Sequence, residues 1–218
     1  MEINKHKYMD EVTKILKLSD INISLYATEL LVEYLKLLYN QNKVINLVSV
    51  KSFEELIETH LYDSSMVARF FPEVLEGSSC VKVIDIGSGG GFPAIPMSII
   101  APSSQWMMVE SIQKKATFLK MVSRALQLHN VIIIPFRAEE FIKSCPIPPL
   151  NLVTFRAVGK IEVLYPFIQI FQKRNIPVML WKNPKEIIDF NQNLPKPIPF
   201  TDYSYPVKDG QKHILVIR

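Results

Sequence analysis

The residues most suggestive of chemistry lie in the stretch VKVIDIGSGGGFPAIP, at positions 81–96. Four of the seven glycines in the 218-residue chain, Gly87 and Gly89–Gly91, fall within five positions directly after an apolar run. Glycine permits positive φ angles and lets backbone N–H groups come close to a ligand. The cluster therefore predicts a loop that binds a ligand through its main chain.

The spacing of the glycines excludes two common nucleotide-binding loops. The dinucleotide fingerprint Gly-x-Gly-x-x-Gly would require glycine where Phe92 stands, and a P-loop would end in Gly-Lys-Ser or Gly-Lys-Thr. The chain instead has Asp85-x-Gly87-x-Gly89-x-Gly91, an acidic residue followed by glycines at every second position.

A second carboxylate belongs to this candidate site. Glu110 ends the apolar run QWMMVE, 19 residues after Gly91. At the end of a second parallel strand, a carboxylate can accept hydrogen bonds from both hydroxyls of an adenosine ribose. The alternative is a structural role, in which Glu110 interacts with the dipole of the helix that follows it.

The elements that position these residues alternate between strands and helices. Short apolar runs predict five strands, at 81–86, 105–110, 131–136, 150–157 and 176–182. Helices are expected after Gly91 and, from their amphipathic patterns, at 111–128 and 161–171, so the order indicates a parallel, doubly wound sheet. The runs 200–207 and 212–218, joined by the turn KDGQ, predict a terminal antiparallel hairpin. Ligands bind such sheets at the carboxyl ends of the strands, which is where the glycines fall.

The N-terminal third has helical periodicity. Ser24 can cap an amphipathic helix over 24–40, and Ser52 with Glu55 forms a capping box at the start of 52–71. We expect a helical extension over residues 1–65 and a sheet domain over 66–218.

The composition sets broad limits on function. Hydrophobic residues make up 48% of the chain and charged residues 21%, which supports a packed core. The net charge of +4 is compatible with nucleic acid but does not indicate it. Isolated cysteines, Cys80 and Cys145, have no zinc-site spacing, and no apolar run approaches the ~18 residues of a membrane span. These features predict a soluble, cytoplasmic protein with no metal site.

The Asp85–Gly91 pattern resembles motif I of the class I S-adenosylmethionine-dependent methyltransferases. The flanking segments give a closer resemblance, to the ribosomal RNA small subunit methyltransferase G family, also called glucose-inhibited division protein B. The match runs from about residue 40 to the C-terminus, over INLVSV, THLYDSS, DIGSGGGFPAIP, VESIQKKATFL, RAEEF, TFRAV, LWK and GQKHILVIR.

The resemblance implies a fold, a cofactor and a substrate. The fold would be α/β and Rossmann-like, a mostly parallel seven-stranded sheet with a C-terminal antiparallel hairpin and an N-terminal helical extension. The reaction would transfer a methyl group from S-adenosylmethionine to guanine N7 in a loop of 16S ribosomal RNA near the decoding centre. The partner would be the small ribosomal subunit, and we expect a monomer. Two alternatives stay open: methylation of a different RNA, a protein or a small molecule, and nucleotide binding without catalysis.

Carried over position by position, the family's cofactor contacts fall on Gly87, Phe92, Ala138, Glu139 and Arg156. The motif itself adds Asp85, Gly89 and Glu110. After the third strand, Ala138 and Glu139 can read an adenine edge, although Glu139 also suits the first turn of a short helix. Arg156 ends the fourth strand, where a ligand carboxylate, Asp85 or a purely structural acid could pair with it.

No catalytic side chain is expected, because guanine N7 has a free lone pair and needs no deprotonation. His60 and Asp63 lie three apart on one helix face, and the resemblance places them beside the cleft. Phosphate contacts are expected either from Lys36, Lys43 and Lys51 in the extension or from a rim of Lys114, Lys115 and Lys182.

The sequence departs from the family pattern at three positions. Ala94 replaces a usual glycine, Val48 stands where threonine is common, and Asn183 follows Lys182 where the family has glycine. Ala94 is small enough to allow close helix–sheet packing. Asn183 can adopt left-handed backbone conformations, so it can partly replace glycine.

Overall fold

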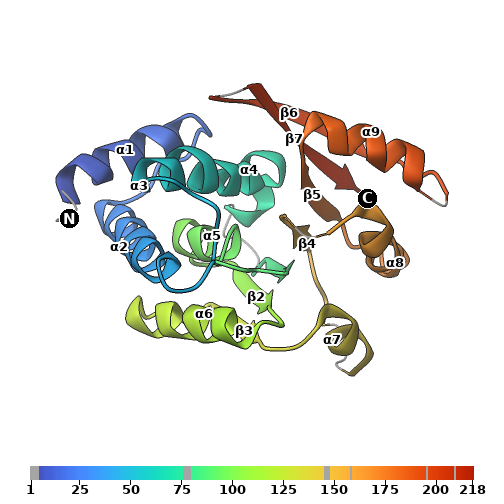
Figure 1. The fold of residues 1–218 in the computed structure, drawn as a ribbon, viewed down its shortest axis with the longest axis horizontal. Helices are drawn as coiled ribbons and strands as arrows, with labels where there is room; N and C mark the ends of the chain where they lie inside the picture. Colours follow the sequence, from blue (N-terminus) through green and yellow to red (C-terminus); the bar gives the residue numbers. More distant parts are fainter. Residues whose placement is uncertain (1–4, 76–79, 145–147, 158, 195, 209) are drawn as a thin grey trace.

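The computed structural model describes residues 5–218 except 76–79, 145–147, 158, 195 and 209. A seven-stranded sheet runs through the molecule in the order β3-β2-β1-β4-β5-β7-β6 (Figure 1). Its strands are β1 (Lys82–Ile86), β2 (Gln105–Val109), β3 (Val131–Ile134), β4 (Leu152–Phe155), β5 (Val178–Lys182), β6 (Thr201–Val207) and β7 (Gly210–Ile217). The first five strands pair in parallel, and β7 pairs antiparallel with both β5 and β6. The predicted sheet and terminal hairpin are confirmed.

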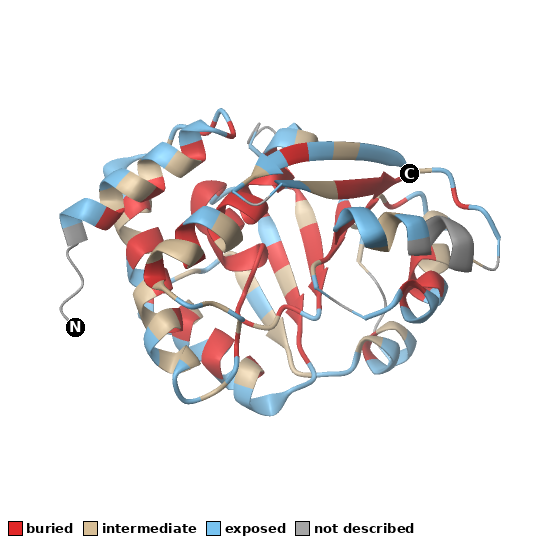
Figure 2. Ribbon diagram, turned by 45° about the horizontal axis from the view of Figure 1, so that its top comes forward, coloured by how far each residue is buried: buried red, intermediate tan, exposed pale blue. Residues whose placement is uncertain are grey.

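Helices cover both faces of the sheet, and each face has its own hydrophobic cluster. One face carries α1 (Lys5–Lys17), α2 (Leu25–Asn42), α3 (Phe53–Glu55), η1 (Leu56–Leu61), α4 (Tyr62–Phe70), η2 (Pro72–Val74), α5 (Ala94–Ile100) and α6 (Gln113–Ala125). The other face carries α7 (Ala138–Ser144), α8 (Ile161–Gln172) and α9 (Pro184–Asn193). Figure 2 shows the buried residues along the strands and the exposed ones on the outer sides of the helices.

The chain changes direction across the sheet at β1. This strand pairs with β2 on one side, Val83 opposite Trp106, and with β4 on the other, Val83 opposite Leu152. In a doubly wound sheet, such a reversal opens a crevice at the carboxyl ends of the two diverging strands. The segments after Ile86 and Phe155 therefore face each other across this crevice.

The N-terminal helices pack directly on the rest of the molecule. Tyr8, Val12 and Leu16 of α1 belong to the same buried cluster as strand residues such as Val216. The proposed boundary at residues 65 and 66 lies within α4. The helical extension is therefore held by apolar burial, the main favourable contribution to folding.

One helical stretch, residues 53–70, contains a π-helical segment. Ser52 caps its start by accepting the Glu55 N–H at 3.2 Å, as predicted, but the Glu55 carboxylate reaches Lys51 N at 2.6 Å, one residue before the position in a standard capping box. The π-helical turns are η1. Such turns occur frequently at functional sites, and η1 contains His60.

Helix α9 was not among the predicted elements, although its start has a clear signal. Asn183 accepts the Glu186 N–H, and the Glu186 carboxylate accepts the Asn183 N–H, which makes a complete capping box. Asn183 has φ −90° and ψ 167°, so it does not adopt the left-handed conformation that asparagine allows. Asparagine serves here as a helix cap. Ala94, fully buried at the start of α5, packs closely as expected.

Within the described residues, the structure contains no helix with both the length and the apolar character needed to cross a membrane.

Candidate active site

The glycine loop combines unusual backbone angles with close packing. Gly87, Gly89 and Gly91 all have positive φ, and at Gly91, with φ 104°, a Cβ atom would lie 2.7 Å from Ile95 Cγ1. At Gly90 the constraint is packing, since a Cβ atom would come within 3.0 Å of Val48 Cγ1 and 3.1 Å of Leu38 Cδ1. Leu38 and Val48 belong to the N-terminal extension, which therefore packs directly against this loop. This close packing explains why position 90 is also a glycine.

Glu110 fixes the loop to the end of β2. One of its carboxylate oxygens accepts the Gly89 N–H and the other accepts the Ile112 N–H, each at 2.8 Å. The Gly87 N–H donates to Val109 O at 2.8 Å. Glu110 is 5% exposed, so its carboxylate is held in one orientation directly under the glycine loop.

Asp85 carries an unsatisfied carboxylate oxygen. Its Oδ1 accepts from Thr154 Oγ1 at 2.7 Å, whereas its buried Oδ2 has no hydrogen-bond partner among the described residues. Burial raises the pKa of Asp85 to about 7, despite the Thr154 hydrogen bond. An orphaned carboxylate oxygen before a glycine loop suits a ligand that brings a positive charge, such as the ammonium group of a methionine moiety.

A cavity of about 180 Å³ lies beside the ends of β1 and β2, between α7 and α8. It brings together three of the expected cofactor contacts, Gly87, Ala138 and Glu139. Phe136, 41% exposed, and Val163, 55% exposed, add apolar surface that sequence reasoning did not select. Main-chain groups between apolar walls suit a flat heteroaromatic ring.

A second cavity, of about 270 Å³, lies at the ends of β4 and β5. It is lined by His60, Asp63, Arg156, Ala157, Trp181, Lys182, Asn183, Glu186 and Lys212. Phe92, only 3% exposed, links this region to the glycine loop: the His60 ring stacks on it at 5.0 Å, and the Arg156 guanidinium lies 5.5 Å from its centroid. Phe92 is thus a buried core residue that contacts two side chains lining this cavity, His60 and Arg156.

Asp63 is the centre of a hydrogen-bond network in this second region. Its Oδ2 accepts from Arg156 Nη2 and from Lys212 Nζ, both at 2.7 Å, and its Oδ1 accepts from Tyr205 at 2.9 Å. The Trp181 indole N–H donates to Asp63 O at 3.1 Å. Burial would raise the pKa of Asp63, but the charges of Arg156 and Lys212 outweigh it and hold that pKa below its usual value.

The partner of Arg156 is a buried acid of the protein, one of the three kinds of partner that the sequence left open. Asp63, not Asp85, forms its ion pair, and His60 Nδ1 receives a second Arg156 contact at 2.8 Å. Burial, then the Arg156 charge, lowers the pKa of His60 to about 3, so its ring is neutral at physiological pH. The prediction that His60 and Asp63 share a face is confirmed, while the roles of Lys212 and Tyr205 were missed.

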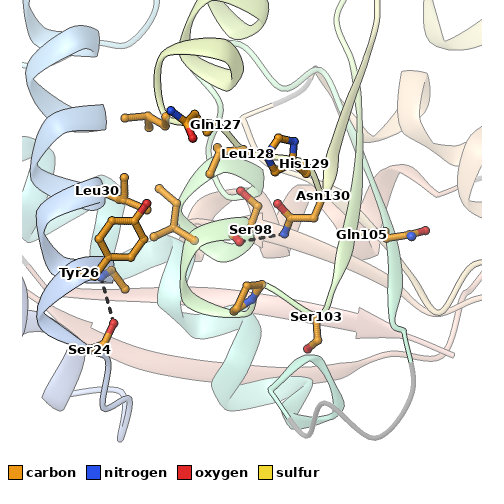
Figure 3. Close-up of a pocket in the computed structure, with 14 residues that line it drawn as sticks. Ser24, Tyr26, Leu30, Ser98, Ser103, Gln105, Gln127, Leu128, His129 and Asn130 are labelled. Atoms are coloured by element: carbon orange, nitrogen blue, oxygen red, sulfur yellow. Dashed lines mark hydrogen bonds between the residues drawn. The ribbon is translucent and has the colours of Figure 1, made fainter.

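A further cleft, of about 450 Å³, lies away from these residues (Figure 3). Tyr26 and Leu30 of α2 face the loop Gln127–Asn130, and Asn130 donates to Ser98 O at 2.9 Å. Gln105 begins β2, so this cleft is at the amino edge of the sheet. Doubly wound sheets bind their ligands at the opposite edge, so the candidate site is the one beside the glycine loop.

The strand order and the acidic residue before alternating glycines define a class I methyltransferase fold. The solved METTL16 methyltransferase domain shares this fold, with a TM-score of 0.63 and 12% identity over 98% of this chain and 91% of that one. The chain belongs to the rRNA small subunit methyltransferase G family, whose model matches residues 27–214.

Curated relatives match nearly the full chain. "Ribosomal RNA small subunit methyltransferase G" of Francisella philomiragia is 30% identical over 209 residues, covering 96% of this chain and 97% of its own length. The protein of the same name from Escherichia coli is 27% identical over 212 residues, covering 96% and 98%.

Proposed function

We propose that the protein transfers a methyl group from S-adenosylmethionine to guanine N7 in 16S RNA of the small ribosomal subunit. The family match over residues 27–214 carries this proposal. The relatives' names specify small-subunit ribosomal RNA, and the fold is one that uses this cofactor. The glycine loop and the two cavities beside it supply a site of the required kind.

The residues present fit this cofactor. Ala138 and Glu139, with Phe136 and Val163, would hold the adenine in the smaller cavity. Glu110 would accept the ribose hydroxyls on the lone pairs that its hydrogen bonds to the Gly89 and Ile112 N–H groups leave free, and Gly87 and Gly89 would let the main chain approach. The unpartnered Asp85 Oδ2 would pair with the ammonium group. Phe92 and Arg156 would border the methionine end, with Arg156 near its carboxylate.

The cofactor supplies a methyl group activated by a sulfonium. The protein's contribution is then to position N7 in line with that methyl group and to stabilise charge as the base becomes cationic. Neither His60, whose Nδ1 is engaged by Arg156, nor Asp63, which has three side-chain donors, is free to act as a base. A methyl acceptor with its own lone pair suits such a site. In folded RNA, the target base must leave its stack to reach it.

The test is methyl transfer from labelled S-adenosylmethionine to small subunits and to 16S RNA from cells that lack this protein. Nucleoside mapping should find a new N7-methylguanine in the 16S RNA. A methyl group on another RNA, on protein or on a small molecule would replace this substrate, and binding without transfer would indicate a non-catalytic role. NAD should not compete for the cofactor site.

A further inference from the structure

The cavity at the ends of β4 and β5 has an excess of positive charge. Three cations line it, Arg156, Lys182 and Lys212. Two carboxylates line it as well, Asp63 and Glu186, while His60 is neutral. One positive charge therefore lacks an anionic partner among the described lining residues. Because a buried charge is costly unless it is paired, this excess points to an anionic ligand.

Lys182 is the least satisfied of the three cations. Its side chain is only 7% exposed, yet its one hydrogen bond within the described residues is a long one, 3.4 Å to Glu186 Oε1. Glu186 is itself 43% exposed, and its other oxygen already accepts the Asn183 N–H at 2.8 Å. An ammonium group has three donors, so Lys182 keeps donor capacity for a ligand.

Lys212 and Arg156 share a single carboxylate. Both donate to Asp63 Oδ2 at 2.7 Å, and the Lys212 side chain is 31% exposed while that of Arg156 is 10% exposed. Lys212 is therefore the member of the pair that remains open to the cavity. Side chains alternate along a strand, so Lys182 reaches the cavity from the α9 face of the sheet and Lys212 from the α4 face.

We propose that Lys182 and Lys212 form a binding pocket for a phosphate group of the target RNA, beside the nucleotide that is methylated. This inference rests on the proposed function, because it assigns the anion to that substrate. The other available anion is the cofactor carboxylate. Arg156 follows β4, which lies in the sheet between β1, the strand before the glycine loop, and β5 and β7, the strands of the two lysines. The lysines are therefore farther from the glycine loop than Arg156 is. Lysine binds phosphate as a compact point charge, and such contacts fix the register of an RNA.

The direct test measures RNA methylation by Lys182→Met and Lys212→Met. The control is Lys173→Met, which removes an exposed lysine at the end of α8, near the amino ends of the parallel strands and away from the cavity. Each pocket variant should raise KM for the RNA substrate about tenfold and reduce the slope of log affinity against log salt by roughly 0.7–0.9. The Kd for S-adenosylmethionine should stay within about twofold. The control should change neither KM nor cofactor affinity substantially. Thermal unfolding confirms that each variant is folded.

Unchanged KM and salt slope in both pocket variants would overturn the proposal. A loss of S-adenosylmethionine affinity as large as the rise in KM for the RNA would also overturn it, since the anion would then be the cofactor carboxylate.

A second experiment separates this pocket from the proposed reaction. Guanosine 5′-monophosphate and guanosine are tested as competitors of RNA methylation or, if no RNA is methylated, as ligands of the protein with bound S-adenosylhomocysteine. The monophosphate should be the stronger ligand by about tenfold, and Lys182→Met should remove this difference. Adenosine binding as strongly as guanosine, with the same gain from the phosphate, would support the phosphate pocket and contradict guanine as the base. Equal strength with and without phosphate in the unmodified protein would overturn the pocket itself.

Discussion

The two cavities at the carboxyl edge of the sheet are built in different ways. The cavity beside Gly87 is lined mainly by apolar residues from the strand ends and from α8. The cavity beside Asp63 depends on charged and hydrogen-bonding side chains, and the partners of Asp63 are 93 to 149 residues away from it in the sequence. The first region shapes a space through backbone conformation, whereas the second balances charges brought together by the fold.

This difference determines what a mutation should do in each region. A change in the glycine loop alters the space available to a ligand, so binding should respond most. A change in the Asp63 network leaves a buried charge without its partner, so the folded state should respond most. The comparison can be tested by measuring stability and binding on the same variants.

The largest effect on stability is expected for Asp63→Asn. The substitution keeps the size of the side chain but leaves Arg156 and Lys212 without a carboxylate in a region where Asp63 is 2% exposed. Breaking a buried ion pair in this way costs about 3–5 kcal/mol. Urea unfolding measures the loss. The matched control is Asp202→Asn, whose carboxylate pairs with His213 at 36% exposure and should contribute no more than about 1 kcal/mol. Similar losses in both variants would contradict the central role of Asp63.

The largest effect on binding is expected for Gly87→Val. Gly87 has φ 75°, a region that a β-branched residue strongly disfavours, and it lines the smaller cavity. S-adenosylmethionine affinity, measured by isothermal titration, should fall by at least about 100-fold, or about 2.7 kcal/mol. Gly210→Val is the control, because Gly210 has φ 128° but lies in the terminal hairpin with no neighbour near its Cβ position. That variant should be strained yet bind the cofactor normally. Retained affinity in folded Gly87→Val protein would remove this residue from the site.

The same contrast explains how much of the site could be predicted from the sequence. The glycine loop follows from residues within seven positions, because local backbone chemistry dictates a turn after a strand. Asp63 could be placed on one helix face with His60 and, by resemblance, beside the cleft, but its partners could not be named, since they come from β5, β6, β7 and the segment after β4. Pairing over such distances depends on strand order and register, which periodicity does not give. Asn183 shows the opposite case: the local capping signal was present in the sequence, whereas the comparison with glycine pointed to a left-handed conformation that this residue does not adopt.

The two regions should also differ in how pH affects their stability. Asp85 has its pKa raised to about 7 in the folded protein, so its contribution to stability is complete below pH ~4 and is lost as pH rises toward 7. His60 has its pKa lowered to about 3, so its contribution is complete above pH ~6.5 and is lost as pH falls toward 3. Between about pH 4 and 6.5, the two slopes oppose each other, each by up to about 1.4 kcal/mol per pH unit.

Single variants should separate these slopes. Relative to the unmodified protein, Asp85→Asn should gain stability as pH rises across this window, and His60→Gln should lose it. Chemical unfolding at pH 4.5, 5.5 and 6.5 measures both differences. Parallel curves for either variant and the unmodified protein would mean that the group in question does not titrate differently on folding.

The smallest effect concerns the surface that faces the RNA outside both cavities. Lys43 is exposed at the end of α2, and Lys51 is exposed before α3. They flank the segment whose Leu47 and Val48 lie against the glycine loop, so they border the same edge of the sheet as the site. Lysines that contact phosphates act through the release of counterions. Neutralising Lys36, Lys43 and Lys51 together should therefore raise KM for the RNA by a few-fold and reduce its salt dependence.

The cofactor affinity of this triple variant should stay nearly constant, because none of the three lysines lines either cavity. Neutralising Lys120, Lys173 and Lys196 removes the same charge from other exposed positions and serves as the control. RNA methylation at two salt concentrations then distinguishes a local contact from the general effect of net charge. If both triple variants behave alike, the lysines of the extension only keep the helices soluble. The RNA would then be bound along Lys114, Lys115 and Lys182, and the pocket variants would have the larger effect on KM.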